Sequence, residues 1–526
     1  MTTYGGVRHD ISHQPREVGS SRRAALPSPV VLTGLLVAGE LLLLTLVSTR
    51  AVDVGEALRY DRTFSPRPLL IAAVLVPVVF VVTRFAARQV LVREVPTVIA
   101  TVVGGMTAQA LLFGLGRHQV TKTVASDTFR VTAERYGTLA VLREHEELAR
   151  ALPMHAKANM PGKVVFYGLL RQVTTSDTVL ALVVLGISAF GGVLVYLIAR
   201  RLFESRQAAL FGVLLYFFVP ARTNAITALN NVTVVLALLL VVLVLRYLDK
   251  PSPVLAVVGG LLGYGALLFD PAVLLVGPVV LALMARHAVV ESLPARSLVQ
   301  LAVGACAAFA VAHVGMRAAL GFDIFDAAAH VERDARSFVR LIRPNWADWP
   351  AVNLREFAIN AGLALSLLVV AAFVDMVVAL LTRRAPLRQA LVDPIWLLTG
   401  TVVLTVVALS LAALNRGEVS RLWLPLAAIL ALVGGAICAE RLPSWVFPVV
   451  LSCLVAQVVF GQQFIRSAMV VLPWDYLQPV EEMTHDVTYL VDAFAGVFLV
   501  TVIALAVRHH RHRSPGPAAR YPSAGS

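Results

Sequence analysis

The chain has 526 residues, of which 58% are hydrophobic and 15% charged, and its formal net charge is +13. A soluble protein of this length could hardly keep so much apolar surface out of aggregates, so the composition excludes an ordinary soluble globular protein. It predicts an all-α, polytopic helical membrane protein.

Apolar runs close to the roughly 20 residues that cross a hydrocarbon core recur along the whole chain and predict about 14 transmembrane helices. They lie near 29–49, 67–84, 96–116, 178–199, 207–220, 228–246, 254–269, 271–286, 297–319, 357–382, 393–414, 421–438, 444–464 and 488–507. The pairs around Pro220 and Asp270 each contain a short run. Each of these pairs is either a tight hairpin or one broken helix.

With fourteen spans, the basic residues of the short connections fall on one side of the membrane. They include Arg84, Arg88, Arg93, Arg200, Arg201, Arg206, Arg246, Lys250, Arg286, Arg383, Arg384 and Arg388. The positive-inside rule makes this side cytoplasmic and places both termini there. The positive charge then reflects topology and anionic membrane lipid, and nucleic acid is not an expected partner.

The two ends of the chain are polar. Residues 1–28 are too long and irregular for a simple cleavable signal, so we expect a disordered cytoplasmic N-terminus and an uncleaved first span. Residues 508–526 begin with a His/Arg run and continue as a Pro/Gly/Ala/Ser tail, which predicts a basic, disordered cytoplasmic end. The three cysteines all lie in predicted spans, so no disulfide framework is expected.

The first large outer loop, residues 117–176, has a broken amphipathic pattern. Helical spacing over 127–140 and 141–152 predicts two short helices separated near Gly137, and Asp127 stands where an N-cap would begin the first. His155 follows Pro153, and the run Asn159-Met-Pro-Gly-Lys163 precedes a further amphipathic stretch over 164–173. A helix N-terminus with Lys163 nearby is a ready anion site, suited to a phosphate.

The second outer loop, residues 321–356, contains many charged residues and two tryptophans, Trp346 and Trp349. Tryptophans close to prolines at a membrane boundary serve either as interfacial anchors or as platforms for sugar stacking. The pattern favours anchors, and both interpretations stay open from sequence alone.

A short turn at 415–421 concentrates Arg416, Glu418 and Arg421 between two apolar spans, on the face where the positive-inside rule disfavours arginine. Arginine offers a fixed fork of donors for a phosphate, and Glu418 would hold one of the two arginines in place. The alternative is a self-satisfied Arg/Glu/Arg cluster at the membrane interface.

These elements together resemble the GT-C superfamily of membrane glycosyltransferases, which use polyprenyl-phosphate sugars. The resemblance rests on Asp127 in the first large outer loop, on His155 followed by the 159–163 run, and on the stretches 343–357 and 416–423. The chain resembles actinobacterial-type members of this superfamily. The resemblance covers roughly residues 96–440. It implies a GT-C-like core over 96–440, two additional N-terminal helices over 29–95 and C-terminal helices over 441–507.

The resemblance implies an inverting transfer of a hexosyl or pentosyl unit at the outer face of the cell membrane. The donor would be a polyprenyl-phosphate sugar, and the acceptor a cell-envelope glycan, lipid or protein. Asp127 would be the general base, while His155, Asn159, Lys163, Arg416, Glu418 and Arg421 would bind substrate. No cofactor is expected, because a lone Asp127 replaces the acidic pair of the family; a divalent cation stays open as an alternative that the sequence does not support.

Each of these roles has an alternative. Asp127 is also explained by helix capping alone, and His155 by a solvated loop position. The competing class for the whole protein is a multi-span transporter or flippase of lipid-linked precursors, with Asp270 and Asp375 among the polar residues of its spans. A ligase or polymerase of lipid-linked glycans is a third class. Charge gathered in outer loops rather than along spans favours the outward-facing enzyme.

Overall fold

The computed structural model describes residues 26, 28–52, 58–60, 66–115, 120–149, 151–290, 293–342, 347, 349–415, 418–467 and 487–512. Over these residues the chain is almost entirely helical. Ten helical segments are long and apolar enough to cross a membrane, and four shorter apolar helices account for the other predicted spans. The prediction of an all-α, polytopic membrane protein is confirmed.

The ten long segments are α1 (Pro29–Ser48), α2 (Arg67–Val92), α3 (Glu94–Leu115), α10 (Asp177–Phe203), α13 (Asn230–Asp249), η1 (Pro271–Val276) with α15 (Gly277–Val290), α16 (Ala295–Leu320), α19 (Leu363–Leu381), α21 (Pro394–Leu411) and α26 (Tyr489–His512). The shorter ones are α11 (Arg206–Phe218), α14 (Pro253–Phe269), α23 (Leu424–Glu440) and α24 (Val446–Phe464). At both ambiguous pairs the chain divides into two separate helices, with α12 (Pro220–Asn224) or η1 at the junction.

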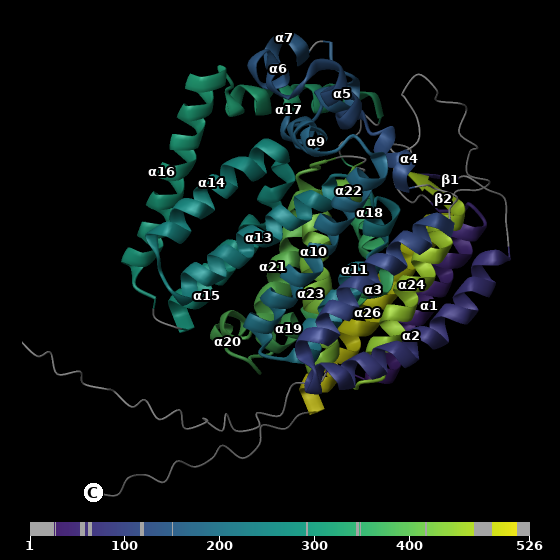
Figure 1. Ribbon diagram of the computed structural model, residues 1–526. Helices are drawn as coiled ribbons and strands as arrows, with labels where there is room; N and C mark the ends of the chain where they lie inside the picture. The colour runs from purple at the N-terminus through teal and green to yellow at the C-terminus, as the bar shows by residue number, and fades with distance from the viewer. Residues whose placement is uncertain are drawn as a thin grey trace, which may run out of the picture.

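Several spans pack closely because glycine allows it. A Cβ added to Gly435 of α23 would lie 2.3 Å from the backbone nitrogen of Gly212 in α11, so these two helices meet backbone to backbone. Figure 1 shows α14, α15 and α16 spread to one side of this core, while α1, α2, α24 and α26 gather on the other. The two additional N-terminal helices therefore pack against C-terminal ones, as α1 and α2 both contact α24.

The predicted span 357–382 is interrupted inside the bundle. Helix α18 (Trp349–Ala361) ends before Gly362, whose φ of 104° suits glycine alone, and α19 begins directly after it. Gln457 of α24 bridges the break: its side chain accepts from the Leu363 amide at 3.1 Å and donates to the Ile359 carbonyl at 2.6 Å. A side chain from another helix thus satisfies the backbone groups that the break exposes.

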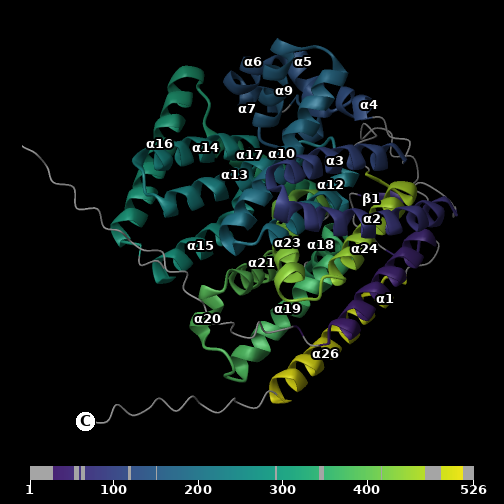
Figure 2. The same cartoon turned by 60° about the horizontal axis from the view of Figure 1, so that its bottom comes forward.

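The first and last membrane helices, α1 and α26, lie side by side. The Val487 amide donates to the Ala51 carbonyl at 3.0 Å, so the end of α1 lies beside the start of α26 and the two helices run antiparallel. Figure 2 shows them side by side. Pro29 and His512 therefore share a face, as an even number of spans requires. Helix α26 continues to His512, so the start of the predicted basic tail is helical, and 513–526 lie outside the described residues, as do 1–25 and 27.

The opposite face holds the two large loops. The first loop folds into α4 (Val120–Ala125), α5 (Thr128–Tyr136), α6 (Thr138–Arg143), α7 (His145–Ala149), α8 (Met154–Lys157) and α9 (Gly162–Val173). The second forms α17 (Ile324–Ile342) and leads into α18, and the remaining short helices are α20 (Leu387–Val392) and α22 (Val419–Leu422). An antiparallel ribbon pairs β1 (Leu58–Tyr60) with β2 (Ile465–Ser467). Figure 1 shows the helices of the first loop and α17 together above the bundle.

The structure tests three expectations for the loops. The break at Gly137 is confirmed: its φ is 79° between α5 and α6, a conformation that favours glycine. The single second helix expected over 141–152 is wrong, because the chain after Gly137 forms two helices, α6 and α7. Trp349, however, is fully buried beside Val352 and Ala413, so it is neither a surface anchor nor an open stacking platform. Trp346 lies outside the described residues.

Candidate active site

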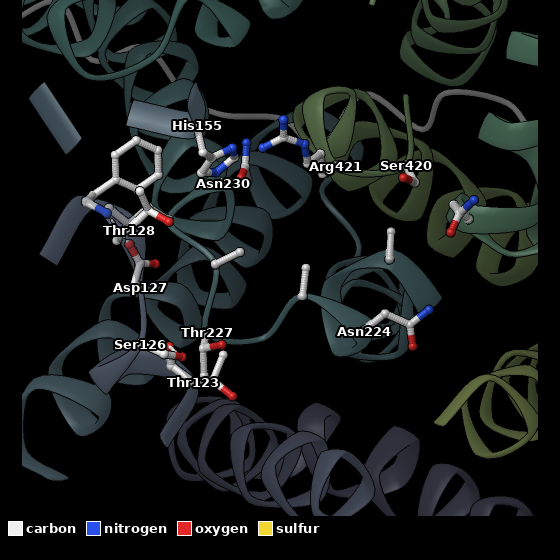
Figure 3. A pocket seen from close by; sticks show the side chains of 16 residues that line it. Thr123, Ser126, Asp127, Thr128, His155, Asn224, Thr227, Asn230, Ser420 and Arg421 are labelled. Carbon is white, nitrogen blue, oxygen red and sulfur yellow. Dashed lines mark hydrogen bonds between the residues drawn. The ribbon is translucent and has the colours of Figure 1, made fainter. Parts of the chain in front are cut away.

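A cavity lies where the first loop meets the ends of the membrane helices, and both a carboxylate and an arginine reach it (Figure 3). Its volume is about 70 Å³. It is lined by Thr123, Ser126, Asp127, Thr128, Phe129, His155, Ala221, Asn224, Ala225, Thr227, Ala228, Leu229, Asn230, Asn360, Ser420 and Arg421. Five separate chain segments thus converge here, and three of the predicted site residues are among them.

Asp127 stands at the N-cap of α5. Its Oδ1 accepts a hydrogen bond from the Phe129 amide at 2.8 Å, so the predicted capping role is confirmed. This bond uses one of the two carboxylate oxygens, and the buried Tyr167 hydroxyl interacts with the same carboxylate beside the cavity wall. Burial raises the pKa of the Asp127 carboxyl to about 6, against the opposing effects of backbone N–H donors and the Lys163 charge. A base with this pKa is ionised at neutral pH and still takes up a proton readily.

His155 projects from α8 and packs against the ring of Phe129, with ring centroids 5.0 Å apart. Burial, together with the positive charges of Arg421 and Lys163, holds the pKa of His155 well below its usual value. The imidazole is therefore neutral, and it can donate or accept one hydrogen bond in the cavity. Figure 3 shows it pointing toward Arg421, with Asn230 close by.

Arg421 belongs to α22, a single helical turn that is held in place by contacts with Glu418 and Glu356. Its guanidinium forms a close ion pair with Glu418, and its buried Nε has no partner among the described residues. The start of α22 is fixed from below, because the amide of Ser420 donates to the buried Glu356 carboxylate at 2.9 Å. The Arg/Glu pairing expected at this turn is present, and it leaves donor capacity for a ligand. Arg416 lies outside the described residues.

Lys163 occupies a different place from the one that the sequence indicates. Its side chain is 1% exposed, and its Nζ lies 2.8 Å from the Asp270 carboxylate, which is 4% exposed. Lys163 is not among the residues that line the cavity. Its ammonium is thus neutralised by Asp270 at the junction of α14 and η1, behind the cavity wall.

The turn before Lys163 is closed to an anion for a steric reason. A Cβ added to Gly162 would lie 2.5 Å from the Leu268 carbonyl oxygen, so the start of α9 is pressed against the end of α14. Asn159 completes this contact: its Oδ1 accepts from Lys163 Nζ at 3.0 Å, and its Nδ2 donates to the His155 carbonyl at 2.8 Å. Asn159 therefore positions the backbone of His155 and does not line the cavity itself.

Sequence reasoning missed a set of neutral polar residues, of which Asn230 is the most informative. It lines the cavity, and its Nδ2 donates to Asp270 Oδ2 at 3.5 Å, which also accepts from Thr233 at 2.9 Å. Asn230 thus connects the buried Lys163–Asp270 pair to the cavity. The missed polar lining residues are Thr123, Ser126, Thr128, Asn224, Thr227, Asn230, Asn360 and Ser420. Two adjacent asparagines at the start of an apolar span were the available signal.

The described residues contain no cluster of three or more His, Cys, Asp or Glu side chains arranged to hold a metal ion. Among the described residues that line the cavity, Asp127 is the one carboxylate. The chemistry of this lining is therefore one weak base, one arginine and several neutral hydrogen-bonding groups. Such a set is matched to proton removal at one end of the cavity and to anion binding at the other.

The chain was compared with known proteins. Residues 166–315 match the model of the dolichyl-phosphate-mannose-protein mannosyltransferase family. This matched segment is similar to the membrane domain of GT-C type glycosyltransferases. No curated protein and no solved structure gives a significant match. The matched segment runs from α9 into α16 and includes Asn230 and Asp270.

The match supports a membrane glycosyltransferase that uses a polyprenyl-phosphate sugar donor. It does not extend to Asp127 and His155 on one side or to Arg421 on the other. The matched segment and the cavity therefore overlap through α12, α13 and their connection. Roles for Asp127, His155 and Arg421 depend on the geometry of the cavity alone.

Proposed function

We propose that this glycosyltransferase moves a sugar, with inversion, from a polyprenyl-phosphate donor to a cell-envelope glycan, lipid or protein at the outer face of the membrane. One observation carries the proposal: the cavity holds a carboxylate with a pKa near 6 and, from a distant part of the chain, an arginine whose Nε has no partner among the described residues. A displacement at an anomeric carbon needs these two groups, a base for the acceptor and positive charge for the departing phosphate.

In the proposed step, Asp127 removes the proton from an acceptor hydroxyl. The oxygen of that hydroxyl forms a bond to the anomeric carbon while the bond from this carbon to the phosphate oxygen breaks. A single displacement from the opposite face inverts the configuration. The polyprenyl phosphate leaves with the electron pair of the broken bond, and the proton stays on Asp127 until water removes it.

Arg421 stabilises the leaving phosphate, with His155 and Asn230 as hydrogen-bond donors beside it. Glu418 holds the guanidinium in one orientation, which lowers the entropy lost when a phosphate binds. The cavity volume of about 70 Å³ is far below that of ordinary small-molecule pockets, roughly 300 Å³ or more, so donor binding requires its walls to separate. The polyprenyl tail remains among the apolar spans.

The outward orientation follows from charge. Helices α1 and α3 both end at the face of the cavity. The basic connections between helices lie at the opposite face, which holds Pro29 and His512. The positive-inside rule assigns that second face to the cytoplasm. Both termini are then cytoplasmic, and the cavity opens outside.

The test compares Asp127→Asn with wild type in proteoliposomes supplied with radiolabelled mannosyl polyprenyl phosphate and extracted envelope acceptors. Asparagine retains the helix cap, so folding is preserved while the base is lost. We expect transfer to fall by about 10²- to 10⁴-fold, the usual contribution of a general base. The product anomer, determined by NMR, should be opposite to that of the donor.

A matched control is available in the second loop. Asp323 accepts from the Phe325 amide at 2.9 Å at the start of α17, as Asp127 does for α5, but it does not line the cavity. Asp323→Asn should leave transfer unchanged. Equal activity of Asp127→Asn and wild type would remove Asp127 from the mechanism. Export of a lipid-linked precursor without any sugar transfer would favour the transporter or flippase class.

A further inference from the structure

A second hollow, unrelated to the cavity, lies between spans on the side of the N-terminal helices. It has a volume of about 690 Å³ and is formed by α2 and α3, with α11 and α24 behind them. We call it the α2–α3 groove. Most of its lining is apolar, and Gly104 leaves part of its wall without a side chain, since a Cβ added there would meet no atom within 4 Å.

The groove extends across most of the bilayer. On α2 its lining begins at Leu75 and ends just past the helix at Arg93. Eighteen residues at 1.5 Å each give a length of about 27 Å, close to the roughly 30 Å of a hydrocarbon core. An extended hydrocarbon chain therefore fits along it.

Apart from Thr83 near the middle of the groove, its polar lining residues lie in the half away from the catalytic cavity. They are Gln89, Arg93, Thr97 and Thr101. Gln89 in the last turn of α2 and Arg93 directly after this helix both line the same end of the groove. Near the catalytic face the lining changes to residues such as Val78, Leu111 and Leu112.

Arg93 is free to bind a headgroup. Its side chain is exposed, and no partner for its guanidinium occurs among the described residues, whereas the neighbouring Arg200 and Arg206 are both paired with Glu94. A positively charged end and an apolar length together select an amphiphile with an anionic head.

We propose that the α2–α3 groove binds an anionic phospholipid, with its phosphate at Gln89 and Arg93 and one acyl chain along the wall at Gly104. The sugar donor does not fit this polarity, because its phosphate belongs at the catalytic cavity, beyond the opposite end of the groove. The site is thus separate from the proposed transfer reaction.

The experiment uses the full chain in neutral detergent and measures binding of palmitoyl-oleoyl phosphatidylglycerol by native mass spectrometry, with phosphatidylcholine of the same chains for comparison. Two variants test the two ends of the site. Arg93→Ala removes the charge, and Gly104→Leu fills the wall. Their matched controls are Arg246→Ala, an exposed arginine at the same membrane face on α13, and Gly315→Leu, an exposed glycine within α16 with equally open space.

We expect phosphatidylglycerol to bind more tightly than phosphatidylcholine, and Arg93→Ala to weaken its binding about fivefold, as one basic residue contributes near an anionic lipid surface. Gly104→Leu should weaken both lipids, and the two controls neither. Folding of each variant is checked by its elution profile and by its transfer activity, which the proposal expects to be unchanged.

Three results would overturn the proposal. Equal affinity for the two phospholipids would show that the site does not select charge. Equal losses in Arg93→Ala and Arg246→Ala would show that Arg93 acts only through net charge. Mannosyl polyprenyl phosphate that competes with phosphatidylglycerol, with affinity lowered by Gly104→Leu and not by Arg93→Ala, would identify the groove as the donor's tail site.

Discussion

Replacing Lys163 by methionine tests whether this residue supports the fold or binds substrate. Its Nζ lies 2.8 Å from the Asp270 carboxylate, and the two side chains are 1% and 4% exposed. At an effective dielectric constant of about 20, the attraction between unit charges at this distance is about 6 kcal/mol, and desolvation of both groups offsets part of it. Loss of one partner leaves the other charge buried, so we expect Lys163→Met to lower the free energy of unfolding by about 3–5 kcal/mol.

The second variant, Asp270→Asn in the Lys163→Met background, separates the two roles. Asparagine can still accept from the Ala272 amide, which Asp270 Oδ1 does at 3.0 Å, and it carries no charge. The double variant should therefore recover most of the lost stability, to within about 1–2 kcal/mol of wild type, because replacing a buried pair costs less than breaking it. Unfolding in mixed detergent micelles, followed by tryptophan fluorescence, measures each change, and sugar transfer is assayed in parallel.

Two outcomes would refute this reasoning. If the double variant is as unstable as Lys163→Met alone, the ion pair does not carry the stability. If Lys163→Met is as stable as wild type but fails to transfer sugar, and Asp270→Asn does not restore activity, Lys163 contacts the substrate. The anion site indicated by the sequence would then be correct.

Three further predictions concern the cavity and its supports. The transfer rate should fall as pH drops below about 6, because the raised pKa of Asp127 leaves the base protonated there. The charge of Lys163 lowers this pKa, so a pH–rate profile of Lys163→Met should show the acidic limb at higher pH. Arg421→Met should lower kcat/KM by about 10²- to 10³-fold, with partial recovery in Arg421→Lys, as donor titrations would reveal; an unchanged kcat/KM would exclude a phosphate contact. Gly162→Ala should destabilise by about 1–3 kcal/mol through overlap with α14. Gly137→Ala meets open space but should also cost about 1–3 kcal/mol, because a φ of 79° with a ψ of 157° is a conformation that essentially only glycine adopts; thermal unfolding measures both losses.

The sequence alone was sufficient for the membrane architecture. Spans are specified locally, since each needs only enough consecutive apolar residues to cross the bilayer, and the predicted spans are helical in the structure apart from the break at Gly362. The turn signals of the first loop are local as well. Gly137 ends α5, and Asp127 begins it, because capping and positive φ depend on neighbours a few residues away.

Partners distant in the chain decided the remaining features. Gln457 caps the break at Gly362 from a helix about a hundred residues away. The sequence around Trp349 indicates a residue at the membrane surface, but packing against other segments buries it.

The opposite roles of two basic residues illustrate what only the tertiary structure decides. Both Lys163 and Arg421 have the sequence character of a phosphate ligand. Folding places Asp270 against Lys163 and neutralises it, while it brings Arg421 to the cavity that Asp127 also lines. Chemical type is a property of each residue and is visible in the sequence. Availability for a ligand depends on which charges and surfaces surround the residue, and those come from segments more than a hundred residues apart.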